Sequence, residues 1–96
     1  TIEIEKAISS HQSVLEVAVV AVPDDKWGEV PKAFIVKKNN AKVTSEEIIE
    51  HVKSKIARFK APKYVEFGEL PKTSTGKIQK YKLRDQEWAG REKRVN

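Results

Sequence analysis

The residues best suited to chemistry lie together in one short stretch, Leu70–Ile78, whose sequence is LPKTSTGKI. Three consecutive residues in it carry hydroxyl groups that can donate hydrogen bonds to phosphate or carboxylate oxygens: Thr73, Ser74 and Thr75. Gly76 permits a left-handed backbone or the close approach of a ligand, and Lys77 adds a flexible positive charge that can neutralise a developing anion. Two interpretations follow from these residues alone: a site for an anionic ligand, or a tight turn whose lysines point into water.

The segment around Gly76 and Lys77 differs from a Walker A phosphate loop, whose pattern is G-x-x-x-x-G-K-[ST]. Pro71 occupies the position of the first glycine, and Ile78 follows the lysine in place of Ser or Thr. Because the hydroxyl group that would hold magnesium is missing, this loop is not a Walker A site.

The composition excludes several other kinds of site. The chain has no cysteine, which rules out disulfides, thiolate zinc sites and cysteine nucleophiles. Its two histidines, His11 and His51, are far apart in sequence and have no carboxylate at metal-ligand spacing. We therefore expect both to be surface or helix histidines and predict no metal site.

Charge is unevenly distributed along the 96 residues, whose net charge is +5. Residues 1–50 carry 6 basic and 9 acidic groups (6 − 9 = −3), whereas residues 51–96 carry 13 and 5 (13 − 5 = +8). This asymmetry favours either a solvated basic face or a surface for a phosphate-bearing partner. A free-standing nucleic-acid-binding module is the less favoured alternative, because aromatic residues are few and not interleaved with the basic ones as a stacking platform requires, and no RNP, KH or zinc signature is present.

The first half of the chain predicts one helix followed by two strands. Ile2–Ser10 has the spacing of a short amphipathic helix. The nearly continuous apolar run Val14–Val22 predicts a buried central strand. Ala33–Val36 predicts a second strand, its start delayed by Pro31, and the turn-length connection predicts an antiparallel pair. Trp27, in that connection, is expected to pack between the hairpin and a helix.

The second half predicts a helix, a strand, the loop and a last helix. Thr44 and Glu47 have the spacing of a capping box, and the helix that they begin is expected to end at Pro62. Its apolar stripe consists of Ile49, Val52, Ile56 and Phe59. Tyr64–Phe67 predicts a third strand, and Lys80 to about Gly90 a terminal helix. The exposed end of the chain is expected to hold Trp88, Arg91, Lys93 and Arg94. The predicted fold class is α+β, with a small three-stranded, mainly antiparallel sheet packed with helices.

Three ordered motifs extend over nearly the whole chain. Leu70–Lys80 is similar to the motif LPKTxTGKIxR, with Lys80 where arginine is often found. Ile4–Asp24, with Glu3 before it, is similar to the pattern E-I-E … H-P-x-V … A-V-V-g-x-P-D, and Asp25–Val36, with Asp24 before it, to D-x-x-W-G-E … A-F-V. With these motifs the chain resembles the C-terminal domain of the AMP-forming acyl-CoA synthetases, which belong to the acyl-adenylate-forming superfamily. The sequence of its loop is most like that of the fatty or medium-chain acyl-CoA synthetases.

The resemblance implies an activity. Such enzymes use ATP, with Mg²⁺, to convert a carboxylic acid to an acyl-adenylate, and then pass the acyl group to coenzyme A (CoA). By motif position, Lys77 corresponds to the lysine that contacts the carboxylate and α-phosphate during adenylation. The rest of the loop then faces the adenylate: Thr73, Ser74, Thr75 and Gly76. In the second reaction, the residues expected near the CoA phosphates are Arg58, Lys60 and Lys63.

The resemblance also implies a single C-terminal lid domain, 1–96, whose partner is an N-terminal ATP- and acyl-binding domain. Alone, the chain should not catalyse acyl activation. We expect no nucleic-acid partner and no transmembrane segment, because no apolar run approaches the roughly 20 residues that span a bilayer. No secretory leader is evident, so a cytoplasmic location is expected. As a third interpretation, Lys77 is a target for lysine acetylation, which would remove its charge.

Overall fold

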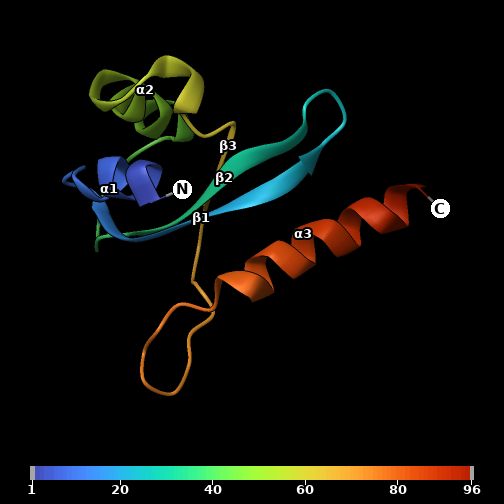
Figure 1. Cartoon of the computed structure of the whole chain (residues 1–96). Coiled ribbons are helices and arrows are strands. Elements are labelled where there is room, and N and C mark those ends of the chain that lie inside the picture. Colours follow the sequence, from blue (N-terminus) through green and yellow to red (C-terminus); the bar gives the residue numbers. More distant parts are fainter. Residues whose placement is uncertain (1, 96) are drawn as a thin grey trace.

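The structure, a computed structural model, describes residues 2–95 (Figure 1). In the last helix it describes the side chains only as far as Ala89. Its elements are, in order, α1 (Ile2–Ser9), β1 (Val14–Asp24), β2 (Gly28–Lys37), α2 (Ser45–Lys55), the 3₁₀ turn η1 (Arg58–Lys60), β3 (Tyr64–Phe67) and α3 (Lys80–Val95). This arrangement of helices on a three-stranded sheet confirms the predicted α+β class. None of the described helices is long and apolar enough to cross a membrane.

The sheet has the strand order β1-β2-β3. β1 and β2 form an antiparallel hairpin, whereas β3 pairs with β2 in parallel, from Lys32 opposite Tyr64 to Ile35 opposite Phe67. The prediction that Val14–Val22 is the central strand is wrong, because β2 lies in the middle. β1 is nevertheless apolar on both faces, since helices cover both sides of the sheet, and burial on two faces gives the same sequence pattern as a central position.

β2 begins earlier than predicted, at Gly28, and contains Pro31. Pro31 lies opposite Ala21 in the hairpin, and its carbonyl accepts a hydrogen bond from the backbone N–H of Lys63 at 2.9 Å. β3 begins only one residue further along, opposite Lys32. Proline is therefore tolerated at this point, where the third strand has not yet joined the ladder.

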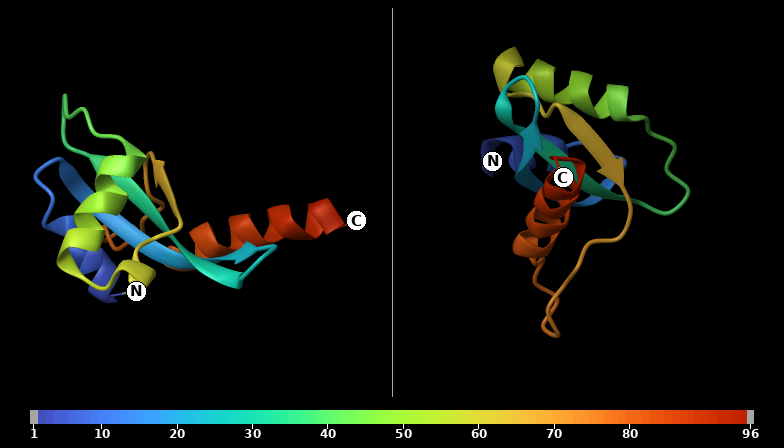
Figure 2. Two further views of the ribbon diagram at one scale, coloured as in Figure 1. Left: turned by 90° about the horizontal axis from the view of Figure 1, so that it is seen from above. Right: turned by 90° about the vertical axis from the view of Figure 1, so that its right-hand side faces the viewer.

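The alternating residues of the strands divide into two hydrophobic cores, one on each face. The first core packs the sheet against α1 and α2 and contains Ile4, Ala7, Ile8, Val14, Val19, Ala33, Ile35, Val43, Ile48 and Val52. The second packs it against α3 and contains Ala18, Val20, Val22, Val30, Phe34 and Leu83. Figure 2 shows α1 and α2 on one side of the sheet and α3 on the other.

The second helix starts as predicted and ends early. The Thr44 hydroxyl accepts a hydrogen bond from the Glu47 backbone N–H at 3.2 Å, as in a capping box. Instead of continuing to Pro62, the helix ends at Lys55, and Ile56 is extended so that the chain can return to the sheet. The predicted apolar stripe is therefore only partly correct. Val52 is buried, but Phe59 is 86% exposed.

The terminal helix lies against the hairpin through a polar bond as well as the apolar core. The indole N–H of Trp88 donates to the carbonyl of Ala21 at 3.3 Å. The prediction that Trp88 belongs to an exposed end is therefore wrong, since its side chain is half-buried. The other side chains placed there, those of Arg91, Lys93 and Arg94, lie outside the described residues.

Lys32 connects the sheet to this helix. Its ammonium group pairs with Glu66 on β3 at 3.0 Å and with Glu87 on α3. Burial lowers the pKa of Lys32, but the hydrogen bonds to Glu87 and Glu66 outweigh this effect and raise the pKa. The charged lysine therefore holds β3 and α3, the two elements that flank the loop with Lys77.

Candidate functional sites

The loop between β3 and α3 is a small closed hairpin, seen below the sheet in Figure 1. Lys72 and Ile78 form an isolated antiparallel bridge. The backbone N–H of Thr73 donates to the carbonyl of Lys77 at 2.8 Å, and that of Gln79 donates to the carbonyl of Pro71 at 2.8 Å. The segment is therefore ordered by its own backbone hydrogen bonds and presents residues 74–77 at its tip.

Thr73 holds the tip of this hairpin together. Its hydroxyl oxygen accepts a hydrogen bond from the Lys77 N–H at 3.1 Å and lies 2.9 Å from the Thr75 hydroxyl. Its carbonyl accepts from the N–H of Gly76 at 2.9 Å, and Gly76 has the left-handed φ of 89° that the sequence suggested. Of the predicted loop residues, Thr73 thus already uses its hydroxyl group in hydrogen bonds within the loop. The hydroxyl group of Ser74 is exposed and has no such bond among the described contacts.

The three lysines of the loop differ in their partners. Lys72 pairs with Glu16 at 2.6 Å, and Lys80 pairs with Glu5 at 2.5 Å. Lys77 is exposed and makes no ion pair with any described residue. Its ammonium group is therefore the one in this loop that is available to an anionic ligand.

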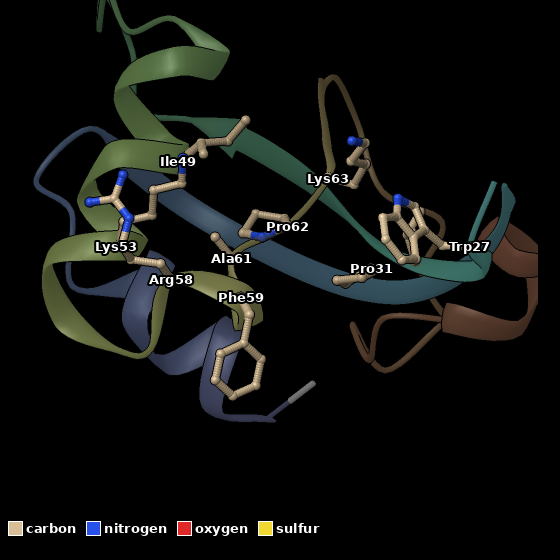
Figure 3. Close-up of a pocket in the computed structure, with 10 residues that line it drawn as sticks. Trp27, Pro31, Ile49, Lys53, Arg58, Phe59, Ala61, Pro62 and Lys63 are labelled. Atoms are coloured by element: carbon tan, nitrogen blue, oxygen red, sulfur yellow. The ribbon is translucent and has the colours of Figure 1, made fainter.

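A groove with a volume of about 550 Å³ lies between the β1–β2 turn, α2 and η1 (Figure 3). Its lining residues are Trp27, Val30, Pro31, Ile49, Lys53, Arg58, Phe59, Ala61, Pro62 and Lys63. Figures 1 and 2 place α2 and the Lys77 loop on opposite sides of the sheet. The chain therefore has two separate candidate sites.

Two large aromatic side chains at this groove are open to solvent. Trp27 is 63% exposed and Phe59 is 86% exposed. The prediction that Trp27 packs between the hairpin and a helix is therefore wrong. Exposed aromatic rings beside a groove are typical of a binding surface, because burying them against a ligand is favourable.

The turn that carries Trp27 is held by one carboxylate. Oδ1 of Asp24 accepts hydrogen bonds from the backbone N–H groups of Lys26 at 2.9 Å and Trp27 at 3.0 Å. Its other oxygen accepts from the Tyr64 hydroxyl at 2.8 Å. These bonds, that from Tyr64 most of all, lower the pKa of Asp24. Since Tyr64 is on β3, the carboxylate fixes the turn relative to the sheet.

The structure brings together two of the three basic residues that were predicted to face CoA. Arg58 and Lys63 line the groove, and Lys53 joins them from α2. Lys60 does not line it, because its ammonium group pairs with Glu3 of α1 at 3.2 Å.

Sequence reasoning missed Trp27, Phe59 and Lys53 as members of a site. The available signal was the alternation of basic and aromatic residues in Arg58–Lys60. Its meaning depended on the helix ending at Lys55, because a longer helix would have buried Phe59.

The uneven charge of the sequence is partly neutralised within the fold. Among the described residues, five ion pairs join a base from residues 51–96 to an acid from residues 1–50: Lys53–Glu50, Lys60–Glu3, Lys72–Glu16, Lys80–Glu5 and Arg84–Glu29. The excess of basic groups in the second half therefore serves to bind the acidic first half. This pairing leaves less free positive charge for a nucleic-acid-binding surface, the less favoured alternative.

The two histidines, though distant in sequence, lie side by side between α1 and α2. Their ring centroids are 4.9 Å apart in an edge-to-face arrangement, and Nε2 of His51 is 2.8 Å from the Ser10 hydroxyl. Burial lowers the pKa of His51, and the nearby His11 and Lys55 add to this effect. The described residues contain no group of three or more potential metal ligands, so we assign this pair to packing.

Comparison with known proteins identifies the family. The sequence profile of the AMP-binding enzyme C-terminal domain matches residues 3–77. The chain belongs to this family. It is 49% identical over 86 residues to the peroxisomal trans-cinnamate:CoA ligase of Petunia hybrida, covering 88% of this chain and 15% of that protein. It is 50% identical over 95 residues to a mitochondrial acyl-coenzyme A synthetase of Homo sapiens, covering 93% of this chain and 16% of that protein.

Solved structures agree with this assignment. A fatty acyl-CoA synthetase of Mycobacterium tuberculosis superposes with a TM-score of 0.82 at 43% identity, over 92% of this chain and 18% of that one. An acyl-CoA synthetase of Brucella canis superposes with a TM-score of 0.86 at 37% identity, over 94% and 17%. The resemblance drawn from the motifs is confirmed, and the chain spans less than a fifth of each of these proteins.

Proposed function

We propose that residues 1–96 are the C-terminal lid domain of an ATP-dependent, AMP-forming acyl-CoA synthetase. The observation that carries the proposal is the state of Lys77, a lysine that is exposed, has no ion pair with any described residue and lies at the tip of an ordered hairpin in a member of this family. An N-terminal domain of the same enzyme would supply the ATP and acyl pockets. The chain alone would therefore be inactive.

In the first half-reaction, the Lys77 loop would close over ATP and the carboxylic acid. A carboxylate oxygen attacks the α-phosphorus, a new P–O bond forms, and pyrophosphate leaves with the electrons of the broken bond. Lys77 would stabilise the negative charge that gathers between the two anions. Ser74 and Thr75 would donate hydrogen bonds to the same oxygens, while Thr73 and Gly76 would keep the tip in shape. Mg²⁺ would enter with ATP, and we assign none of the described residues to it.

In the second half-reaction, the groove would receive the nucleotide end of CoA. Arg58 and Lys63, with Lys53, would face its phosphates, and the exposed rings of Trp27 and Phe59 would stack on its adenine. The thiolate of CoA then attacks the acyl carbon, and AMP leaves. We leave Lys60 outside this set because it is paired with Glu3.

The positions of the two sites support a rotating lid. The Lys77 loop and α2, which lines the groove, lie on opposite sides of the sheet (Figures 1 and 2), and the core packing joins them into one small body. One active centre could therefore face only one of them at a time, and the domain would turn between the two half-reactions.

The choice of acid would belong to the missing N-terminal domain. Relatives 46–51% identical to this chain are named for different acids: trans-cinnamate, acetate, 2-methylpropanoate and 4-hydroxybutyrate. Such varied acids beside such similar C-terminal domains suggest that this domain does not select the substrate. Relatives also include peroxisomal and mitochondrial proteins, so the domain suits compartments other than the expected cytoplasm.

The decisive experiment replaces Lys77 in the full-length enzyme and measures each half-reaction separately. The four carboxylic acids named above are first screened as substrates of the full-length enzyme, and the acid that is activated fastest is used in both assays. Lys77→Ala should slow pyrophosphate release by roughly 100- to 1,000-fold, as expected for the loss of one electrostatic contact to a transition state. Thioester formation from a supplied acyl-adenylate and CoA should change by less than about threefold, because the groove is untouched.

Lys82→Ala is the matched control, because Lys82 is an exposed lysine near the start of α3. It should leave both half-reactions within about twofold of the wild type. An equal loss of both half-reactions in Lys77→Ala, with an unchanged melting temperature, would show that the assigned role is wrong.

A further inference from the structure

Two carboxylates from the N-terminal part of the chain hold the two ends of the Lys77 hairpin. Lys72, at the first end, forms the bridge with Ile78 and pairs with Glu16 of β1 at 2.6 Å. Lys80, at the second end, is the first residue of α3 and pairs with Glu5 of α1 at 2.5 Å. The lysine between them, Lys77, is therefore carried on a loop that is fixed on both sides.

Glu5 makes the more constrained of the two contacts. Its Oε2 atom accepts a hydrogen bond from the backbone N–H of Val19 at 2.7 Å and also contacts the ammonium group of Lys80. One carboxylate oxygen thus joins α1, the edge strand β1 and the start of α3. The Glu5 side chain is only 20% exposed, so this pair is less screened by water than an open surface pair.

Glu16 reaches the other end because it lies on the α3 side of β1. The register of β1 with β2 shifts just before it, between Val14 and Glu16, as in a β-bulge, and Val14 belongs to the core on the opposite face. Glu16 is two residues from Ala18, whose side chain belongs to the core under α3, and alternation places both on the same face. The carboxylate therefore lies on the side of the sheet where the hairpin packs.

Apolar contacts set the depth of the hairpin but not its orientation. Leu70 and Ile78 pack against the second core, one from each side of the loop. Two apolar contacts allow the tip to tilt, whereas two directional ion pairs at the ends resist tilting. We propose that Glu5 and Glu16 are positioning residues for adenylation, which act through Lys80 and Lys72 to hold Lys77 where it meets the reacting groups.

This proposal rests on the adenylation role proposed for Lys77. Partly exposed ion pairs contribute little to overall stability, so loss of either carboxylate should leave the fold intact. A displacement of about 1 Å at a reacting group can nevertheless cost up to 100-fold in rate. The effect is therefore expected in the rate of adenylation rather than in the melting temperature.

The test uses the full-length enzyme and the half-reaction assays described for Lys77. Glu5→Gln and Glu16→Gln remove the charge at constant size, and each should lower kcat for pyrophosphate release by roughly three- to tenfold. The KM for ATP and thioester formation from the acyl-adenylate should stay within about twofold. Glu50→Gln is the matched control, because it breaks the 3.6 Å pair with Lys53 on α2, away from the loop. Its pyrophosphate release should be unchanged.

A charge exchange separates positioning from a general loss of structure. Lys72→Glu alone places two carboxylates together and should slow adenylation more than Glu16→Gln does. Adding Glu16→Lys restores an ion pair of opposite sense, and the double variant should recover to within about threefold of the wild type. Absence of recovery, or equal losses in both half-reactions, would overturn the proposal.

The same experiment separates the two levels of inference. If Lys77→Ala abolishes adenylation while both glutamine variants retain full activity, the positioning role is wrong and the proposed function stands. If Lys77→Ala is itself active, the proposed function fails, whatever the glutamine variants show.

Discussion

The Lys77 loop and the aromatic groove differ in how the chain builds them. The loop is one continuous segment, closed by its own backbone hydrogen bonds between Lys72 and Ile78. The groove collects side chains from the β1–β2 turn, β2, α2, η1 and the segment before β3. A contiguous site can be recognised in a sequence, whereas an assembled site becomes visible only after folding. If both proposals are correct, each site can be damaged without the other.

Removal of the aromatic rings at the groove should give the largest difference between the effect on the KM for CoA and the effect on adenylation. Trp27→Ala and Phe59→Ala should each raise the KM for CoA by roughly five- to 100-fold, because stacking on a base contributes about 1–3 kcal/mol. The rate of pyrophosphate release should not change. Steady-state kinetics with CoA varied and the adenylation assay would measure the two effects.

Tyr81→Ala provides the control for these substitutions. Tyr81 is a similarly exposed aromatic residue, at 59%, but it lies on α3 and not at the groove. Its loss should leave the KM for CoA unchanged. If all three aromatic substitutions raise this KM equally, the groove is not the CoA site.

Two glycines allow the same backbone change to be made in each region. Gly76 has φ 89° and Gly28 has φ 80°, and an added Cβ would meet no atom within 4 Å at either position. Alanine therefore adds backbone strain alone, about 1–2 kcal/mol. Gly76→Ala should slow adenylation by roughly five- to tenfold and spare the KM for CoA. Gly28→Ala, beside Trp27, should do the reverse. Parallel losses in both assays would break the distinction between the regions.

Tyr64→Phe should give a smaller effect, confined to the groove. It removes the hydrogen bond that contributes most to the lowered pKa of Asp24 and loosens the turn that presents Trp27. The KM for CoA should rise roughly two- to threefold, as for the loss of one exposed hydrogen bond.

The same variant has a signature in the pH dependence of stability. The pKa of Asp24 is lower in the folded chain than in the unfolded chain. The ionised carboxylate therefore adds to the free energy of unfolding at a pH above the unfolded pKa, and this stabilisation is lost as the pH falls through the folded pKa. The free energy of unfolding should therefore fall less steeply in Tyr64→Phe than in the wild type on acidification below about pH 4. Urea unfolding at several pH values would measure it, and identical slopes would contradict the assignment.

Local signals in the sequence predicted the parts of the fold that depend on neighbouring residues. The N-cap hydrogen bond of Thr44, which is one half of the predicted capping box, and the left-handed backbone of Gly76 are both found in the structure. The end of α2 was missed because no Gly or Pro marks it, and the chain leaves the helix at Ile56 to rejoin the sheet. The sequence predicts a packed Trp27 because an aromatic residue beside a turn is often buried, but in the folded chain Asp24 holds this turn and Trp27 is exposed.

The firm attachment of the Lys77 hairpin also makes it a suitable place for a spectroscopic label. The chain has no cysteine, so Glu69→Cys, at an exposed residue just before the hairpin and outside the proposed site, would give this domain a single point of attachment. Because the hairpin is tied to α1, β1 and the second core, a dye there would follow the orientation of the whole domain. If the domain turns as proposed, energy transfer to a second dye on the N-terminal domain of the full-length enzyme would report, molecule by molecule, which half-reaction the enzyme is set to perform.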